Sequence, residues 1–163
     1  MSILLVDLAA ADATVLASAL RVEGFDVVIA PTAREARAAM ATRSIALAIV
    51  DLMLRSEGGS SGLDLAREMR ADYPATRVLL TSSYHLSERQ LERADCGVSG
   101  FIPKPYDLAE VVAFVRRKSS APPSSRRLWC VETDGPASGM ETGHPSGFDL
   151  IVPANDVANG TRR

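Results

Sequence analysis

Short apolar runs alternate with amphipathic stretches through the first 118 residues of the chain, and this alternation restricts the fold more than any other feature. The runs are ILLVD at Ile3–Asp7, DVVIA at Asp26–Ala30, IALAIVDL at Ile45–Leu52, RVLLT at Arg77–Thr81 and GFI at Gly100–Ile102. Runs this short that are apolar at successive positions are typical of strands buried on both faces of a parallel sheet. The sequence therefore predicts a sheet of five parallel strands.

The stretches between these runs have the pattern of helices. Capping boxes pair Thr32 with Glu35 and Ser87 with Gln90, and Asp107 can cap a helix over DLAEVVAFVRRK. Strands that alternate with helices in this way need right-handed crossovers and place helices on both faces of the sheet. We therefore predict a doubly wound α/β domain with five helices.

The composition changes near Lys118. Of the 11 Gly and 9 Pro in the chain, half lie beyond this residue. We predict a core domain over residues 1–118, a Pro/Ser linker over 119–127 (SSAPPSSRR), and a tail over 128–163. In the tail only Leu128–Glu132 and Phe148–Val152 have the pattern of strands, so we expect a loose hairpin, a segment that orders on binding, or disorder.

Charge and composition exclude several classes of protein. The 18 basic and 20 acidic residues nearly balance, which argues against a nucleic-acid partner held by bulk electrostatics. The tail lacks the two or three helices of a helix-turn-helix module, so we expect no DNA-binding output. No basic leader and no apolar run of about 18 residues is present, and we expect a cytoplasmic protein without membrane contact. Cys96 and Cys130 are expected to be reduced thiols.

Residues with complementary chemistry follow the predicted strands. Asp7 ends the first strand, Asp51 the third and Thr81 the fourth, and the fifth runs into Lys104. In doubly wound folds the carboxyl ends of the strands form the ligand site, so these side chains should converge. Two carboxylates, a hydroxyl and an ammonium suit phosphoryl transfer to Asp51, with a metal held by the carboxylates and with Thr81 and Lys104 bonding the phosphoryl oxygens.

Over residues 1 to about 118, the sequence resembles the receiver domain of bacterial two-component response regulators. The resemblance rests on five motifs in order: LLVD (Leu4–Asp7), IVDLM (Ile49–Met53), SGLDL (Ser61–Leu65), LLTSS (Leu79–Ser83) and GFIPKP (Gly100–Pro105). It implies a flavodoxin-like sheet of strand order 2-1-3-4-5. It also implies that the chain is a phospho-acceptor and not an enzyme.

The resemblance assigns a role to each site residue. It implies that Asp51 is the phospho-acceptor, that Thr81 is the switch hydroxyl, that Phe101 responds to Thr81, and that Lys104 contacts the phosphate. Asp7, Asp51 and the backbone carbonyl of Met53 would hold Mg²⁺. It also implies a cis bond before Pro105. The implied partners are a histidine kinase or phosphotransfer protein upstream and a protein target downstream, bound through the face formed by the fourth helix, fifth strand and fifth helix.

Two departures from the family affect the site. Leu8 stands where receivers carry a second acidic residue after the first strand, which should weaken Mg²⁺ binding without abolishing it. Asp12 is a candidate to compensate for this loss. The loop RSEGGSS, Arg55–Ser61, is about three residues longer than the common family form and lacks its proline, which should alter access to the site or the choice of partner.

Three functions remain open from the sequence. The first is a stand-alone receiver that is phosphorylated on Asp51 and signals by protein contacts. The second, favoured by Leu8, is a pseudo-receiver that binds proteins without phosphorylation. The third is a small enzyme or nucleotide binder, which the absence of a GxGxxG or P-loop motif disfavours. His85 lacks the acid and oxyanion loop of a serine hydrolase, and we interpret it as a surface residue.

Overall fold

The computed structural model of the protein describes residues 1–7, 9–54, 61–84 and 98–120. Within them, five strands form one sheet: β1 (Ser2–Val6), β2 (Asp26–Ala30), β3 (Leu47–Asp51), β4 (Arg77–Ser82) and β5 (Gly100–Pro103). Four helices accompany the strands: α1 (Ala10–Val22), α2 (Ala33–Thr42), α3 (Gly62–Asp72) and α5 (Leu108–Ser120). The helix predicted to begin at Ser87 lies outside the described residues.

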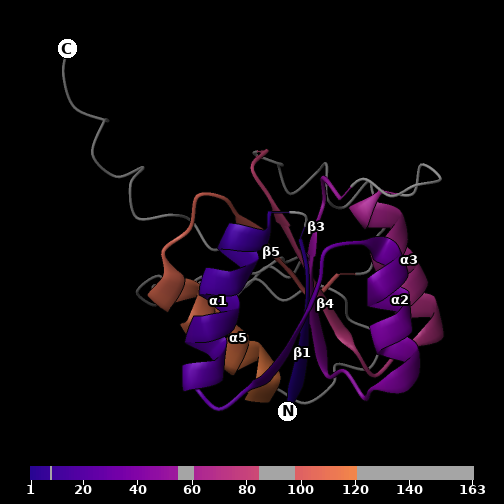
Figure 1. Cartoon of the computed structure of the whole chain (residues 1–163), viewed down its shortest axis with the longest axis horizontal. Coiled ribbons are helices and arrows are strands. Elements are labelled where there is room, and N and C mark those ends of the chain that lie inside the picture. Colours follow the sequence, from indigo (N-terminus) through magenta and orange to yellow (C-terminus); the bar gives the residue numbers. More distant parts are fainter. Residues whose placement is uncertain (8, 55–60, 85–97, 121–163) are drawn as a thin grey trace, which may run out of the picture.

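The sheet has the strand order β2-β1-β3-β4-β5, and all four pairings are parallel. Helices α1 and α5 cover one face, and α2 and α3 cover the other (Figure 1). This arrangement confirms the predicted doubly wound, flavodoxin-like fold and its order 2-1-3-4-5.

Alternate side chains of each strand divide the core into two layers, because successive residues of a strand point to opposite faces. In β1, Ile3 and Leu5 face the layer under α1 and α5, whereas Leu4 and Val6 face the layer under α2 and α3. All four are at most 2% exposed. The core is mainly aliphatic, as the low aromatic content of the chain requires, and Phe101 and Phe114 are its largest fully buried side chains.

The two predicted helix caps that fall on described residues are confirmed. Thr32 caps α2 by accepting the N–H of Glu35, and Asp107 accepts the N–H of Glu110 at the start of α5. A complete capping box at α3 joins Ser61 and Asp64. It was not predicted, because Ser61 closes the Gly- and Ser-rich stretch that indicates a loop. Helix α1 has no side-chain cap at Ala9.

The observed strands differ from the predicted runs by one residue at several ends, and by two residues at the start of the third strand. The third strand begins at Leu47 and not at Ile45, because the carbonyl of Ile45 accepts the hydroxyl of Thr76 and not a strand N–H. It ends at Asp51, one residue before the predicted end, and the N–H of Leu52 still bonds the carbonyl of Thr81. Helix α5 continues to Ser120, two residues past the predicted domain boundary at Lys118. None of the helices described is long and apolar enough to span a membrane.

Candidate functional site

The period of the strands places the candidate residues on one face of the sheet. Asp7 follows Ile3 and Leu5 at steps of two residues, and Asp51 follows Leu47 and Ile49 in the same way. Thr81 follows Leu79, and Lys104 follows Ile102. The apolar members of these series all belong to the layer under α1 and α5. The four polar side chains therefore lie at the carboxyl ends of the strands on that same side.

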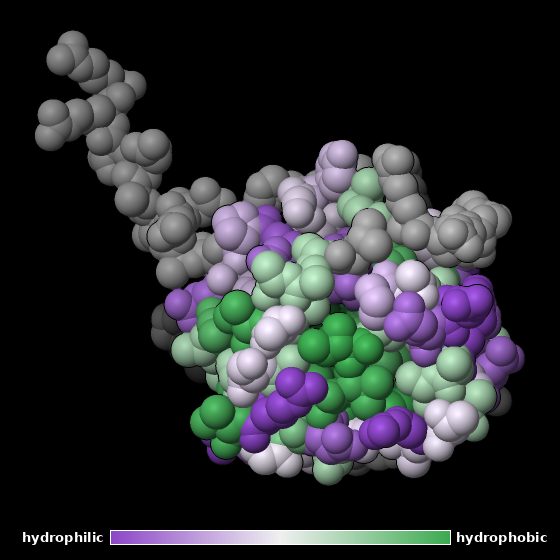
Figure 2. All heavy atoms as spheres, viewed as in Figure 1, coloured by the Kyte–Doolittle hydropathy of each residue, from purple (hydrophilic) through white to green (hydrophobic). Residues whose placement is uncertain are grey.

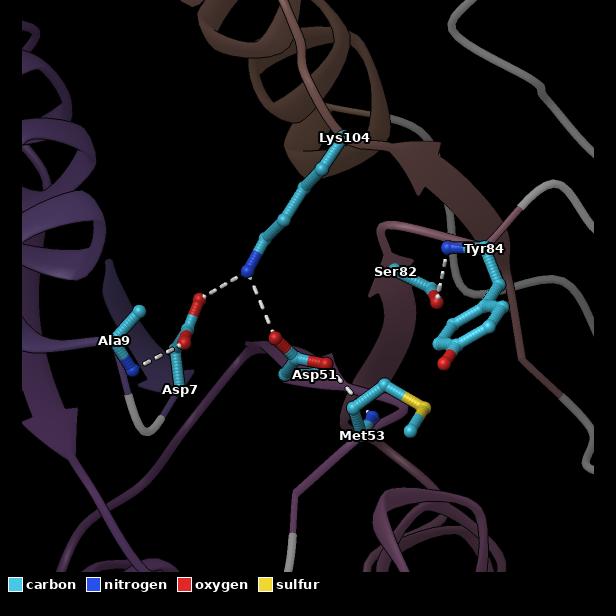
Figure 3. A network of polar contacts seen from close by, with 7 residues as sticks. All are labelled: Asp7, Ala9, Asp51, Met53, Ser82, Tyr84 and Lys104. Atoms are coloured by element: carbon cyan, nitrogen blue, oxygen red, sulfur yellow. Dashed lines mark hydrogen bonds and ion pairs between the residues drawn. The ribbon is translucent and has the colours of Figure 1, made fainter.

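Lys104 joins the two carboxylates (Figure 3). Its Nζ donates to Oδ2 of Asp7 at 2.6 Å and to Oδ2 of Asp51 at 2.8 Å. The three side chains are 11 to 14% exposed. The site therefore holds one positive and two negative charges in a partly desolvated position, where charge-assisted hydrogen bonds are short and strong.

Backbone N–H groups hold the other oxygen of each carboxylate. The N–H of Ala9 donates to Oδ1 of Asp7 at 2.8 Å, and the N–H of Met53 donates to Oδ1 of Asp51 at 2.7 Å (Figure 3). Each carboxylate thus has one oxygen fixed by its own following loop and the other directed at Lys104. This arrangement orients Asp51 without any ligand.

The charges also affect the ionisation of Lys104. Burial by itself would lower the pKa of this ammonium, but the hydrogen bonds and charges of Asp51 and Asp7 together outweigh burial and raise its pKa above the ordinary value. Lys104 is therefore positively charged at neutral pH and can neutralise added negative charge on Asp51.

Thr81 lies beside Asp51 with its hydroxyl unused. The two residues are paired in register between β3 and β4, and Thr81 is 4% exposed. Its Oγ1 is buried without a hydrogen-bond partner among the described residues. Thr81 lines a small cavity together with Asp7 and Tyr106. A buried hydroxyl without a partner is unfavourable, so it is available for a group that arrives at Asp51.

Phe101 lies on the opposite face of the sheet from Thr81. It is 1% exposed and packs with Leu54, Leu80 and Val98 in the layer that α2 and α3 cover. The structure therefore shows it as a core aromatic residue, a position that does not conflict with the switch role implied by the resemblance. Any response to Thr81 has to pass through the β4 and β5 backbones, because Phe101 is adjacent to Leu80 in the ladder.

Two neighbours of the site were not identified from the sequence. Gly62, the first residue of α3, lies so close to β3 that an added Cβ would be 1.9 Å from the carbonyl oxygen of Asp51. Tyr106 is half-buried beside the site. Burial raises the pKa of its phenol; the charge of Lys104 opposes this shift, and the carboxylates of Asp7, Asp12 and Asp51 add to it. A glycine directly after the loop and an aromatic residue after Lys104-Pro105 were the available signals. The Lys104–Pro105 bond is cis, as the resemblance implied.

The donor set is compatible with a hard divalent cation. Asp7 and Asp51 direct two carboxylates at one point, which an ammonium now neutralises, and Mg²⁺ is usually held by one or two carboxylates with waters and phosphate oxygens. No group of three or more His, Cys, Asp or Glu residues that could hold a metal occurs in the described part of the chain. The residues therefore fit Mg²⁺ with a reduced number of protein ligands.

Some predicted features of the site cannot be placed. Leu8, residues 55–60 of the long loop, and His85 lie outside the described residues. Asp12 is exposed on the first turn of α1 and lines an open cleft of about 600 Å³ together with Ser83, Lys104 and Tyr106.

Comparisons with known proteins agree with the fold. The family model of the response regulator receiver domain matches residues 3–116. The DNA-binding response regulator MtrA of Mycobacterium tuberculosis (strain ATCC 25618 / H37Rv) is 32% identical over 160 residues, which cover 92% of this chain and 68% of MtrA. The photosynthetic apparatus regulatory protein RegA of Rhodobacter capsulatus is 29% identical over 122 residues, which cover 75% of this chain and 65% of RegA.

Solved structures give the same result. A response regulator from Thermotoga maritima is 28% identical with a TM-score of 0.65, and the match covers 74% of this chain and 98% of that one. A CheY-like receiver domain protein from Methanospirillum hungatei shares the fold at 24% identity, with a TM-score of 0.65 over 72% of this chain and 92% of its own. The chain therefore belongs to the family of response regulator receiver domains.

Proposed function

We propose that the chain accepts a phosphoryl group on Asp51 from a histidine kinase or a phosphotransfer protein. The observation that supports this proposal is the shared ammonium of Lys104, which contacts Asp51 and Asp7 at the carboxyl ends of their strands, beside the unpartnered hydroxyl of Thr81. We further propose that the chain is a phospho-acceptor and not an enzyme, and that it acts in the cytoplasm.

In the proposed reaction, a carboxylate oxygen of Asp51 attacks the phosphorus of a phosphohistidine. The new O–P bond forms as the P–N bond breaks, and the imidazole nitrogen leaves with the electron pair. Lys104 stays within reach of the phosphoryl oxygens because Asp7 holds its Nζ at 2.6 Å. Asp7, Asp51 and the carbonyl of Met53 would hold Mg²⁺, which supplies positive charge to the phosphoryl oxygens when bound.

The phosphoryl group would change the contacts of Thr81. A phosphoryl oxygen gives the buried hydroxyl of Thr81 the hydrogen-bond acceptor that it lacks, and movement of Thr81 would alter β4 and the packing of Phe101 behind it. We propose that the surface that includes β5 and α5 reports this change to a downstream protein.

The output has two candidate classes. The sequence favours a stand-alone receiver that acts by protein contacts, because the residues after α5 are rich in Gly and Pro. Output through DNA is a second candidate, because the match to MtrA, described as a DNA-binding response regulator, covers 92% of this chain and so extends beyond the receiver domain. Titration of the 163-residue chain with labelled duplex DNA at low and physiological salt distinguishes the two, since salt-sensitive binding would favour the second.

The acceptor role is tested by incubating the protein with Mg²⁺ and acetyl phosphate and measuring its intact mass. We expect a gain of one phosphoryl group, which Asp51→Asn abolishes and Asp72→Asn, at an exposed position on α3, retains. Labelling of the Asp51→Asn protein would place the acceptor elsewhere. No labelling of the parent protein would favour the pseudo-receiver, in which the same fold binds proteins without phosphorylation.

A further inference from the structure

Helices α1 and α5 leave an apolar groove open between them on the surface. At the end of the groove near the last turn of α1, Val22 and Ala19 of α1 face Val112 and Ala113 of α5 across a cleft of about 600 Å³. Towards the site, the groove continues past Leu108 into the open cleft that includes Val15. Val22 is 86% exposed and Val15 is 58% exposed. In Figure 2, hydrophobic and polar side chains alternate over α1, on the left of the view, and a larger hydrophobic area lies near the centre.

The exposed valines form a continuous stripe. Val15, Ala19 and Val22 are spaced by four and three residues, so they lie on the same side of α1. The buried side of α1 is a different one, and its residues already pack in the core: Ala13, Leu16, Ala17 and Leu20. An apolar stripe beyond the core side indicates a surface that another apolar segment covers.

The chain itself supplies a segment with matching chemistry. Arg126 and Arg127 precede the run Leu128–Val131, which contains Trp129, the one tryptophan of the sequence. The groove is lined by small aliphatic side chains, and its rim carries the carboxylates of Asp12 and Asp107. The two cations that also line it, Lys104 and Arg116, are already paired with other carboxylates. Asp12 and Asp107 complement the two arginines.

The point where α5 ends brings this segment within reach. The Glu23–Arg116 ion pair, at 3.2 Å, joins the end of α1 to the C-terminal half of α5, and both residues line the groove there. From Ser120 back to Leu108 the helix rises about 18 Å, whereas the Pro-containing linker over 121–127 can extend about 22 Å. A tether of this length gives a high effective concentration, so even weak apolar contacts would keep the segment bound.

We propose that Leu128–Val131 packs into the groove between α1 and α5 of its own chain, with the indole ring of Trp129 inserted between the two helices. This contact attaches the tail to the receiver domain along the side of the open cleft that Lys104 lines. The proposal does not depend on phosphorylation of Asp51.

The fluorescence of Trp129 in the 163-residue protein tests the proposal, because no other tryptophan contributes. We expect emission at shorter wavelength and weaker quenching by neutral acrylamide than in the denatured chain, both independent of protein concentration. Replacing Val15→Lys and Val22→Lys together should abolish both effects, since the two cations repel the arginines and remove apolar surface. The matched control, Ala38→Lys with Ala71→Lys, adds the same charge at exposed positions of α2 and α3 and should change neither.

Three results would overturn the proposal. These are Trp129 fluorescence equal to that of the denatured chain, protection that persists in the double Val→Lys protein, and protection lost on dilution, which indicates a second copy of the chain instead. Amide chemical shifts of Trp129→Ala give an independent readout in an otherwise intact protein. Changes that include α1 and α5 support docking, and changes confined to other elements contradict it.

Discussion

At the scale of single residues, the balance of charge around Lys104 determines the stability of the site. Lys104→Met would leave the carboxylates of Asp7 and Asp51 close together, partly buried and without their shared cation. Removal of one partner from a buried ion pair typically costs about 3 to 5 kcal/mol. We expect a loss of about 3 kcal/mol in the free energy of unfolding at neutral pH, measured by urea denaturation.

We also expect the effect of Lys104→Met on the free energy of unfolding to depend on pH. Because the folded pKa of Lys104 is raised, its contribution to stability is fully present below the unfolded pKa of about 10.4 and is lost as pH rises through the folded value. The difference between the parent and Lys104→Met should therefore be constant near neutral pH and shrink above about pH 10.4. As a control, Asp51→Asn with Lys104→Met should be more stable than Lys104→Met alone, since only one carboxylate then lacks a partner. Strictly additive losses would contradict this coupling.

We predict that Leu8 weakens the affinity for metal, because the family resemblance places a second acidic residue at this position. Leu8→Asp should lower the metal-free melting temperature, because a third carboxylate near Asp7 and Asp51 costs about 1 to 3 kcal/mol. It should also increase stabilisation by Mg²⁺ and speed phosphorylation by acetyl phosphate. Thermal melts of both proteins with and without Mg²⁺ measure this. If the variant gains no more from Mg²⁺ than the parent, position 8 does not face the site.

The sequence could indicate which residues would meet at the site because strand ends in a parallel sheet share one edge. Asp7, Asp51, Thr81 and Lys104 were found in this way, and the structure places them on one face. Two features of the site could not be predicted, because both depend on side-chain conformations. These are the two ion pairs of Lys104, with Asp7 and Asp51, and the unused hydroxyl of Thr81. The burial of Phe101 could be predicted for a phenyl ring in an apolar strand, whereas its place on the face opposite Thr81 depends on the strand register.

At the scale of elements, the contact of α3 with the end of β3 holds Asp51 in place. A Cβ at Gly62 would overlap the carbonyl oxygen of Asp51, so Gly62→Ala must shift β3 or α3. We expect a loss of about 1 to 3 kcal/mol in stability and slower phosphorylation of Asp51. Urea denaturation measures the loss in stability, and the rate of phosphoryl mass gain measures the change in phosphorylation.

Gly24→Ala is the matched control for this change. Gly24 has a φ of +87° and no atom within 4 Å of an added Cβ, so alanine costs about 1 to 2 kcal/mol of backbone strain far from the site. It should lower stability and leave the phosphorylation rate unchanged. Equal effects of both substitutions on the rate would show that Gly62 acts only through overall stability.

Element types were predictable, but some boundaries were not. All five strands were predicted because continuous apolar runs are the signature of buried parallel strands. Ile45 is as apolar as its neighbours and is buried, so composition could not show that its carbonyl bonds the Thr76 hydroxyl outside the ladder. Ser61 was assigned to a loop because it follows a Gly- and Ser-rich stretch, which is typical of loops, although it caps α3.

At the scale of the whole molecule, the members of both core layers that the structure describes all lie before Ser120. The innermost positions of α5, Val111, Phe114 and Val115, are at most 2% exposed, and they pack with described residues of α1 and of the sheet. We therefore predict that a protein truncated after Lys118 folds on its own, as the composition change at that residue suggested. It should melt cooperatively.

The truncation also separates the domain from the proposed tail contact. If Leu128–Val131 only covers the groove between α1 and α5, truncation should lower the melting temperature slightly and expose Val15 and Val22, which would increase binding of an apolar dye. A matched protein of full length with Trp129→Ala should show the same dye binding, because it loses the same contact. Aggregation or loss of most of the stability after truncation would mean instead that the tail is part of the core, and that the domain extends beyond residue 118.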